Sequence, residues 1–252
     1  MKLIVTDLDN TLLRSDKTIS EYTVNVLRRC VEKGYRIVIA TARAENAMKR
    51  FIDQITPYAL ISSGGSMVTL KGEVIYSSIL SPSDVSVILN ECTRITCGKG
   101  KISVESVAGY FCNFVPDDID RFNAFEYKDF SSFNYPCYKI TAELEHYEWG
   151  EIIAEKCSDC SVLRYSGEKW HRFSTKTSTK EIALIKLLDI LDINCDDVIA
   201  FGDDFNDLGM LKLAGISVAP SNAIDKIKSV SQYITCSNND DGVARFLEKY
   251  IL

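Results

Sequence analysis

The feature that most constrains the fold is a repeated alternation of short apolar runs with amphipathic helical segments. Residues 2–6 (KLIVT) and 35–41 (YRIVIAT) are mostly apolar runs of strand length. Between them, apolar side chains recur at helical spacing from Ser20, a typical N-cap, to Gly34, a typical helix stop. Apolar strands between such helices are typical of a parallel sheet that is covered on both faces. The N-terminal third is therefore predicted to form βαβ units.

The same alternation returns near the C-terminus. Residues 177–191 are predicted to form a helix that begins with a capping box between Ser178 and Glu181. Residues 197–204 (DVIAFGDD) and 216–220 (ISVAP) are predicted to be strands. The two parts together predict a doubly wound α/β fold around a parallel sheet. Further predicted elements are helices at 42–54, 206–215 and 242–251 and strands at 58–65 and 232–236.

The stretch between these two parts has a different character. It is richer in aromatic residues and contains strand-like pieces at 102–114 (ISVESVAGYFCNF) and 138–144 (YKITAEL). We therefore predict a separate α+β module at 82–175, inserted into the parallel fold with boundaries near Pro82 and Thr175. The two-part core then consists of residues 1–81 and 176–252.

Charge and cysteine content narrow the class of protein. The formal net charge of −6 argues against a nucleic-acid binder, whose electrostatic footprint is normally basic. The opening apolar run (LIV) is too short for a signal peptide or a membrane-spanning helix. Nine scattered cysteines, an odd number, are typical of a reducing compartment. We expect a cytoplasmic protein with no nucleic-acid or membrane partner.

Polar side chains stand at the ends of three predicted strands. Asp7 follows the first strand, Thr41 ends the second, and Asp203 ends a later one. Because ligands bind at the carboxyl ends of the strands in an open parallel sheet, these side chains are expected to meet. Lys180 joins them from the first turn of its helix, where anions are attracted. This set of side chains suits the binding of a phosphate together with a divalent cation. The alternative interpretation is that Asp7 and nearby Asp9 are solvent-facing carboxylates at the end of a strand.

Four motifs in this order resemble those of a known family. DLDNT at 7–11 resembles the nucleophile motif of the haloacid dehalogenase-like (HAD) phosphohydrolases, and GDDFND at 202–207 resembles their fourth motif. Thr41 matches the second motif and Lys180 the third. The segments AGISVAPSNAIDKIK and NNDDGVARFL, with the large insertion, are similar to the Cof-type sugar-phosphatase branch. The resemblance implies a HAD-like, Rossmannoid core with an inserted cap domain that sets substrate specificity.

The resemblance also implies a role for each site residue. Asp7 is implied to be the nucleophile that forms an aspartyl-phosphate, and Asp9 the general acid and base. Mg²⁺ is implied to bind the carboxylates of Asp7 and Asp203 and the backbone carbonyl of Asp9. Asp207 is implied to support these ligands without binding the ion itself. The implied phosphate-binding groups are Thr41, Lys180, Asn206 and the backbone amides of Leu8 and Ala42.

The function that these roles imply is a Mg²⁺-dependent phosphatase of small phosphorylated metabolites, with sugar phosphates favoured. One alternative is a phosphosugar mutase, which would use the same aspartate pair, Asp7 and Asp9. Phosphate release without stimulation by a sugar bisphosphate would separate the two. A second alternative, from another class, is a non-catalytic sensor of phosphorylated metabolites, which would show no turnover.

Overall fold

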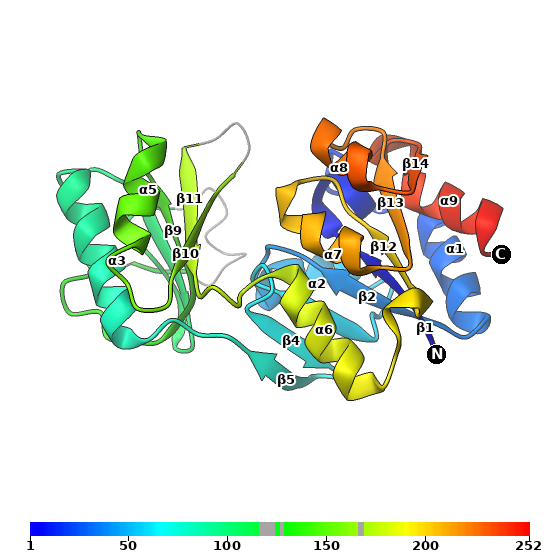
Figure 1. Cartoon of the computed structure of the whole chain (residues 1–252), viewed down its shortest axis with the longest axis horizontal. Helices are drawn as coiled ribbons and strands as arrows, with labels where there is room; N and C mark the ends of the chain where they lie inside the picture. The colour runs from blue at the N-terminus through cyan, green and yellow to red at the C-terminus, as the bar shows by residue number, and fades with distance from the viewer. Residues whose placement is uncertain (116–123, 127–128, 166–168) are drawn as a thin grey trace. The chain divides into compact units, whose positions relative to one another are not determined.

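The computed structural model of the protein describes residues 1–115, 124–126, 129–165 and 169–252. The chain divides into two compact units (Figure 1). Met1–Tyr76 and Thr179–Leu252 form the first, which we call the core unit, and Ser77–Ser178 form the second, which we call the inserted unit. The boundaries expected near Pro82 and Thr175 both fall inside the inserted unit.

The core unit is built on an eight-stranded sheet with the order β14-β13-β12-β1-β2-β3-β4-β5. The six strands from β14 to β3 pair in parallel, as predicted, whereas β4 is antiparallel to β3. Only the short segment 63–66 joins β3 to β4, which is too short for the crossover that a parallel pair requires. The strands are β1 (Lys2–Thr6), β2 (Tyr35–Ala40), β3 (Ala59–Ser62), β4 (Met67–Leu70), β5 (Glu73–Ser77), β12 (Val198–Phe201), β13 (Ile216–Pro220) and β14 (Tyr233–Thr235).

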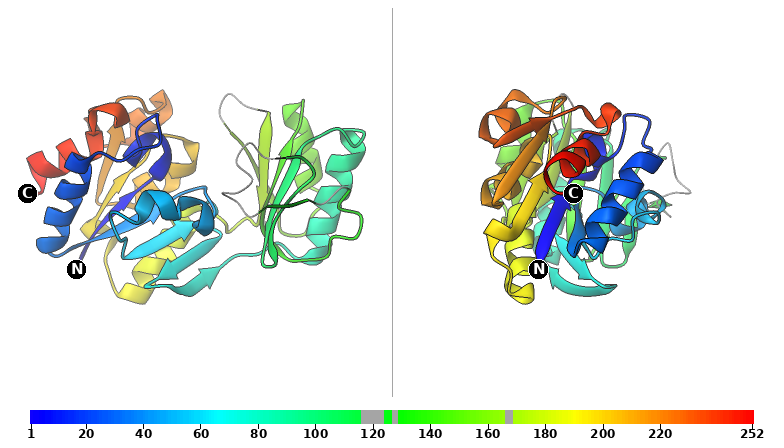
Figure 2. Two further views of the ribbon diagram at one scale, coloured as in Figure 1. Left: turned by 180° about the vertical axis from the view of Figure 1, so that it is seen from behind. Right: turned by 90° about the vertical axis from the view of Figure 1, so that its right-hand side faces the viewer.

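Helices cover both faces of this sheet, as Figure 2 shows in its right-hand view. Successive residues of β1 point to opposite faces, so Ile4 packs in one apolar cluster and Leu3 and Val5 in another. The cluster of Ile4 takes in α1, α2 and α9, and the other takes in α6, α7 and α8. The helices are α1 (Glu21–Glu32), α2 (Glu45–Ile52), α6 (Lys180–Leu191), α7 (Leu208–Leu213), α8 (Asp225–Val230) and α9 (Gly242–Tyr250), with short helical turns η1 (Leu8–Leu12), η2 (Cys195–Asp197), η3 (Phe205–Asp207) and η4 (Asn238–Asp240).

Of two predicted helix N-caps, one is confirmed and one is wrong. Ser20 caps α1 as predicted, since its hydroxyl accepts a hydrogen bond from the backbone N–H of Thr23 at 3.0 Å. The capping box predicted at Ser178 is wrong. The hydroxyl of Ser178 lies 2.8 Å from that of Thr175, and Thr179 caps α6 instead. Because the helix starts one residue later, Lys180 becomes its first residue.

The inserted unit is a six-stranded sheet whose described helices pack on one face. Its order is β10-β11-β9-β6-β7-β8. Its described helices, α3 (Pro82–Ile95) and α5 (Tyr147–Ala154), both contribute to an apolar cluster with Ile140 of β9 and Phe173 of β11. This is the predicted α+β architecture. The strands are β6 (Ile102–Ser106), β7 (Gly109–Cys112), β8 (Ala124–Glu126), β9 (Cys137–Glu143), β10 (Ser161–Arg164) and β11 (Trp170–Ser174).

The cysteines act as ordinary side chains in both units. All nine lie in described segments, and all are free thiols. Cys30 packs in a core-unit cluster, and Cys92 and Cys137 pack in the cluster of the inserted unit. Burial raises the pKa of the Cys30 thiol to about 11, so this group stays protonated. Within the described residues, no helix combines the length and the apolar character needed to cross a membrane.

Candidate active site

Two carboxylates meet at the carboxyl ends of adjacent strands. β1 and β12 pair in parallel with Thr6 opposite Phe201. The chain leaves β1 at Asp7, whose backbone N–H donates to the carbonyl of Phe201 at 2.9 Å. Asp203 follows two residues after β12 and is buried, as is Asp7. The parallel pairing thus places residues from opposite ends of the chain at one edge of the sheet, where ligands bind in open α/β folds.

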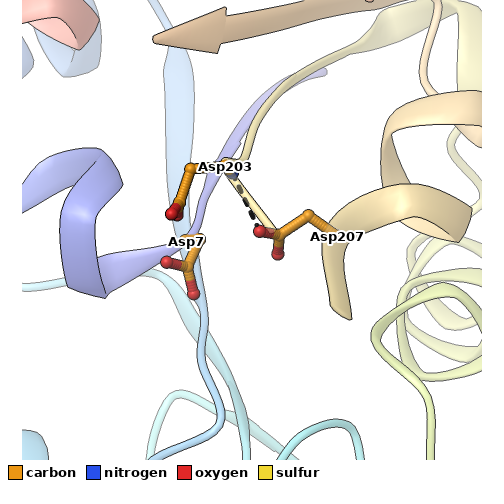
Figure 3. Close-up of side chains that lie close together, drawn as sticks. All are labelled: Asp7, Asp203 and Asp207. Atoms are coloured by element: carbon orange, nitrogen blue, oxygen red, sulfur yellow. Dashed lines mark hydrogen bonds between the residues drawn. The ribbon is translucent and has the colours of Figure 1, made fainter. Parts of the chain in front are cut away.

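A third carboxylate, that of Asp207, completes the cluster (Figure 3). Asp7, Asp203 and Asp207 each offer a carboxylate oxygen within 4.8 Å of the others, and all three residues are buried. The Asp207 carboxylate is fixed because it accepts hydrogen bonds from the backbone N–H of Asp203 at 3.0 Å and of Asp204 at 3.2 Å. Gly202 makes this approach possible, since a Cβ there would lie 2.4 Å from that of Asp207.

Lys180 brings an ammonium group to the cluster. Its side chain is 2% exposed, and its Nζ donates to Asp7 at 2.5 Å and to Asp207 at 2.6 Å. Burial opposes the charged form, but the two carboxylates outweigh burial and hold the pKa of Lys180 above its usual value. Gly65 allows this arrangement. It has a φ of +102°, and a Cβ there would lie 2.2 Å from the backbone of Thr179 at the start of α6.

The charges of this cluster fit a divalent cation. Three carboxylates face one ammonium, so negative charge remains uncompensated. Burial raises the pKa of Asp203 to about 7, even though the Thr11 hydroxyl donates to it at 2.7 Å. Burial also raises the pKa of Asp7, and the neighbouring carboxylates add to the effect while Lys180 opposes it. Hard divalent cations such as Mg²⁺ prefer carboxylate oxygens, so the donor set suits that ion.

The side chain of Asp9 turns away from this cluster toward two cations. The Arg43 guanidinium donates twice to its carboxylate, both times at 2.6 Å, and Lys17 donates at 2.9 Å. The backbone allows this because Asn10 adopts a left-handed φ of 57° within η1. Burial alone would raise the pKa of Asp9, but the hydrogen bonds from Arg43 and Lys17 outweigh it and bring the pKa below its usual value.

The predicted phosphate-binding residues lie around the same edge. Thr41 is buried at the end of β2, the neighbour of β1, and its hydroxyl accepts from the backbone N–H of Arg43 at 3.2 Å. Ala42 follows it and is half-buried, and Asn206 is half-buried beside Asp207 in η3. The Leu8 side chain is fully buried in the core, which leaves only its backbone for a ligand.

Sequence reasoning missed three residues of the site: Lys17, Arg43 and Thr11. Arg43 lies two residues after Thr41, and Thr11 closes the DLDNT segment, so both stand inside motifs that had drawn attention. Proximity to a motif was therefore an available signal for these two. Lys17 carries no such signal, because it reaches Asp9 only through the loop that follows η1.

A doubly wound sheet with an acidic cluster and a buried lysine at its carboxyl edge defines the class of HAD-fold hydrolases. A family model described as haloacid dehalogenase-like hydrolase matches residues 4–247, and the chain belongs to this family. It is 29% identical to the 5-amino-6-(5-phospho-D-ribitylamino)uracil phosphatase YitU of Bacillus subtilis, over 98% of this chain and 97% of YitU.

Solved structures share the whole architecture. A haloacid dehalogenase-like hydrolase from Bacteroides thetaiotaomicron is 27% identical, with a TM-score of 0.84 over 98% of each chain. The HAD subclass IIB sugar phosphatase BT4131 has the same fold, with a TM-score of 0.83 over 99% of each chain at 20% identity. These likenesses extend over both units, so the inserted unit belongs to the shared fold.

Proposed function

We propose that this protein is a Mg²⁺-dependent phosphatase that hydrolyses small phosphorylated metabolites, with sugar phosphates favoured, through an aspartyl-phosphate. The observation that carries the proposal is the separation of Asp7 from Asp9. Asp7 lies in a buried cluster beside Lys180, whereas Asp9, two residues on, is held apart by Arg43 and Lys17. A nucleophile and a proton-transfer group require different surroundings, and the different partners of Asp7 and Asp9 support separate roles for them.

In the proposed reaction, a carboxylate oxygen of Asp7 attacks phosphorus and the ester P–O bond breaks. Asp9 takes up a proton from solvent when the ester binds, gives it to the departing alkoxide, and then takes a proton from the water that hydrolyses the aspartyl-phosphate. To carry that proton, Asp9 has to loosen its hydrogen bonds to Arg43 and Lys17 when the ester binds. Lys180 stays charged beside Asp7 and offsets the negative charge of the phosphoryl oxygens.

The metal would be held by the carboxylates of Asp7 and Asp203 and the backbone carbonyl of Asp9, with Asp207 in support. When bound, Mg²⁺ supplies charge neutralisation at the phosphoryl oxygens. Thr41, Asn206 and the backbone amides of Leu8 and Ala42 would orient the phosphoryl group, since catalysis of phosphoryl transfer depends mainly on positioning and charge.

The relatives guide the choice of substrate. One is named for the phosphate ester of a ribitylaminouracil, and another is named a sugar phosphatase. Both substrates are small polyhydroxylated molecules with a phosphate ester. We propose that this protein acts on the same broad class, that the inserted unit selects among its members, and that the reaction takes place in the cytoplasm.

The test is a screen of the purified full chain for phosphate release, with Mg²⁺ and with a chelator. The panel contains sugar phosphates, 5-amino-6-(5-phospho-D-ribitylamino)uracil, nucleotides, pyridoxal phosphate and p-nitrophenyl phosphate. We expect Mg²⁺-dependent release that needs no sugar bisphosphate. Asp7→Asn protein controls for contaminating phosphatases. No turnover on any ester would contradict the proposal and favour a sensor, and a requirement for bisphosphate would favour a mutase.

A further inference from the structure

The inserted unit buries a positive charge that its described side chains leave incompletely paired. Arg172 of β11 is only 5% exposed. Its Nε and Nη1 atoms are buried and have no hydrogen-bond partner among the described residues. Burial lowers the pKa of the Arg172 guanidinium, which nearby Tyr165 offsets only in part. Because a buried ion without hydrogen bonds or a counter-charge is costly, such a group is expected where a ligand supplies the missing acceptors.

The register of the sheet places Arg172 between Leu163 of β10 and a row of polar residues. It stands opposite Thr141 of β9, and Thr141 in turn stands opposite Ser103 of β6. Because side chains alternate along a strand, this row points away from Phe173 and from the apolar cluster of α3 and α5. We call this side of the sheet the polar face. Its central residues are Ser103, Glu105, Tyr110, Lys139, Thr141 and Arg172.

Among the described side chains, the other charges of the polar face do not neutralise Arg172. Lys139 and Glu105 form an ion pair with each other at 3.2 Å, and each side chain is 11% exposed. Glu143 lies opposite Trp170 and accepts no hydrogen bond from Nε or Nη1 of Arg172. The ion pair therefore accounts for one cation and one anion, and within the described residues Nε and Nη1 of the guanidinium remain for a ligand to meet.

We propose that the polar face is an oxyanion-binding site in which Arg172 receives a carboxylate or phosphate group of a small molecule. A guanidinium matches such planar or tetrahedral oxyanions through paired N–H groups, and the hydroxyls of Thr141 and Ser103 lie in the same row of the sheet. The inference rests on the proposed function in one respect: we take the bound small molecule to be the phosphate ester that the phosphatase hydrolyses. Preferred substrates then carry a second anionic group besides the phosphate that is released.

The kinetic test compares matched pairs of esters. 6-Phosphogluconate is compared with glucose 6-phosphate for a carboxylate, and fructose 1,6-bisphosphate with fructose 6-phosphate for a second phosphate. We expect kcat/KM to favour the more anionic member of at least one pair by about 10- to 100-fold, the usual range for hydrogen bonds to a charged group. In Arg172→Gln protein this ratio is expected to fall toward one, and in Arg172→Lys protein to an intermediate value.

Arg164→Gln is the matched control. Arg164 lies in the same sheet, opposite His171 of β11, and is exposed on the other face. The same substitution there is expected to leave the ratio of kcat/KM values unchanged. A wild-type ratio near one for both pairs would overturn the proposal, and so would a ratio that survives Arg172→Gln. The wild-type comparison decides even if a variant fails to fold.

A second measurement keeps the site testable if no ester is hydrolysed and the proposed function fails. The chain has two tryptophans, and Trp149→Phe leaves Trp170, two residues from Arg172 on β11, as the fluorescent reporter. Sulfate and malonate, as small dianions, are expected to change its emission saturably, and Arg172→Gln is expected to abolish the change. No saturable change with either anion would overturn the site independently of catalysis.

Discussion

Two buried cations, one in each unit, have different surroundings. In the core unit, Lys180 is 2% exposed and contacts two carboxylates that come from different segments of the chain. In the inserted unit, Arg172 is almost as deeply buried, yet two of its guanidinium nitrogens have no partner among the described residues. The first arrangement is assembled before any ester arrives, whereas the second lacks the group that would satisfy it.

This difference suggests that the two units have different roles in the proposed reaction. Charges that are already matched hold reacting groups in a fixed geometry, which is what a phosphoryl-transfer site requires. A buried cation without a partner instead favours ligands that carry a negative group. It can therefore select among substrates. We therefore infer that reactivity depends on the core unit and selectivity on the inserted unit. The predictions below test that contrast, from the largest expected effect to the smallest.

Asp7→Asn should have the largest effect, on the chemical step. It removes the attacking carboxylate, so the expected loss of kcat is on the order of 10⁶-fold, as for other covalent nucleophiles. The measurement is phosphate release from p-nitrophenyl phosphate and from the best ester of the screen. Acid-quench mass spectrometry of wild-type protein should find the phosphoryl adduct on Asp7. Normal turnover in the variant, or an adduct elsewhere, would contradict the assignment.

Asp9→Asn should have a smaller effect that depends on the leaving group. Loss of a general acid typically costs about 10²–10⁴-fold, and a good leaving group needs the acid less. The loss should therefore be smaller for p-nitrophenyl phosphate than for a sugar phosphate. Arg43→Gln removes one of the two cationic partners of Asp9 without removing the acid, so its loss should be smaller than that of Asp9→Asn. Equal losses on both substrates for Asp9→Asn would show that Asp9 transfers no proton to the leaving group.

Removing each buried cation tests the contrast directly through stability. Lys180→Met leaves Asp7 and Asp207 buried without their ammonium, which should cost about 3–5 kcal/mol of unfolding free energy in metal-free protein. Arg172→Met removes a charge without a matching partner, so the inserted unit should be unchanged or more stable. Urea unfolding followed by hydrogen exchange reports each unit separately. Strong destabilisation by Arg172→Met would show that the fold itself satisfies this charge.

The smallest expected loss concerns a carboxylate of the inserted unit that is fully satisfied. Asp84 accepts hydrogen bonds from the backbone N–H and the hydroxyl of Ser158, both at 2.8 Å, and from the N–H of Asp159 at 3.4 Å. Burial alone would raise the pKa of Asp84, but these hydrogen bonds bring it below its usual value. A lowered pKa in the folded state adds stability above the unfolded pKa of about 4, and this stability is lost as the pH falls further.

Asp84→Asn should therefore cost about 1.5–3 kcal/mol at neutral pH, and the difference from wild type should shrink below pH 4. Hydrogen exchange of α3 and of the segment around Ser158 is the measurement. Asp241→Asn is the matched control in the core unit, where Asp241 accepts from Arg14, Ser20 and Thr23. Its effect should appear in α1 and α9 and not in α3. A pH-independent difference would show that charge plays no part at Asp84.

The amino-acid sequence alone determined the parallel core and the residues at its edge. Apolar runs such as 35–41 and the helical spacing after Ser20 report burial locally, because each depends only on the period of its own element. Strand ends follow from those runs, and in a parallel sheet they meet on one side. That is why the closeness of Asp7, Asp203 and Lys180 could be expected before any coordinates were known.

Only the tertiary structure decided which charges are paired. Arg43 and Lys17 reach Asp9 because the loops after β2 and η1 converge, and Asp207 reaches the cluster because Gly202 lets it approach. The start of α6 moved from the predicted Ser178 because a hydroxyl of another segment, that of Thr175, engages it. Such partners depend on the register of strands and on how loops from distant segments are placed. Neither leaves a periodic pattern in the sequence. For the same reason, no sequence pattern indicates that Arg172 is buried with two nitrogens that have no partner among the described residues.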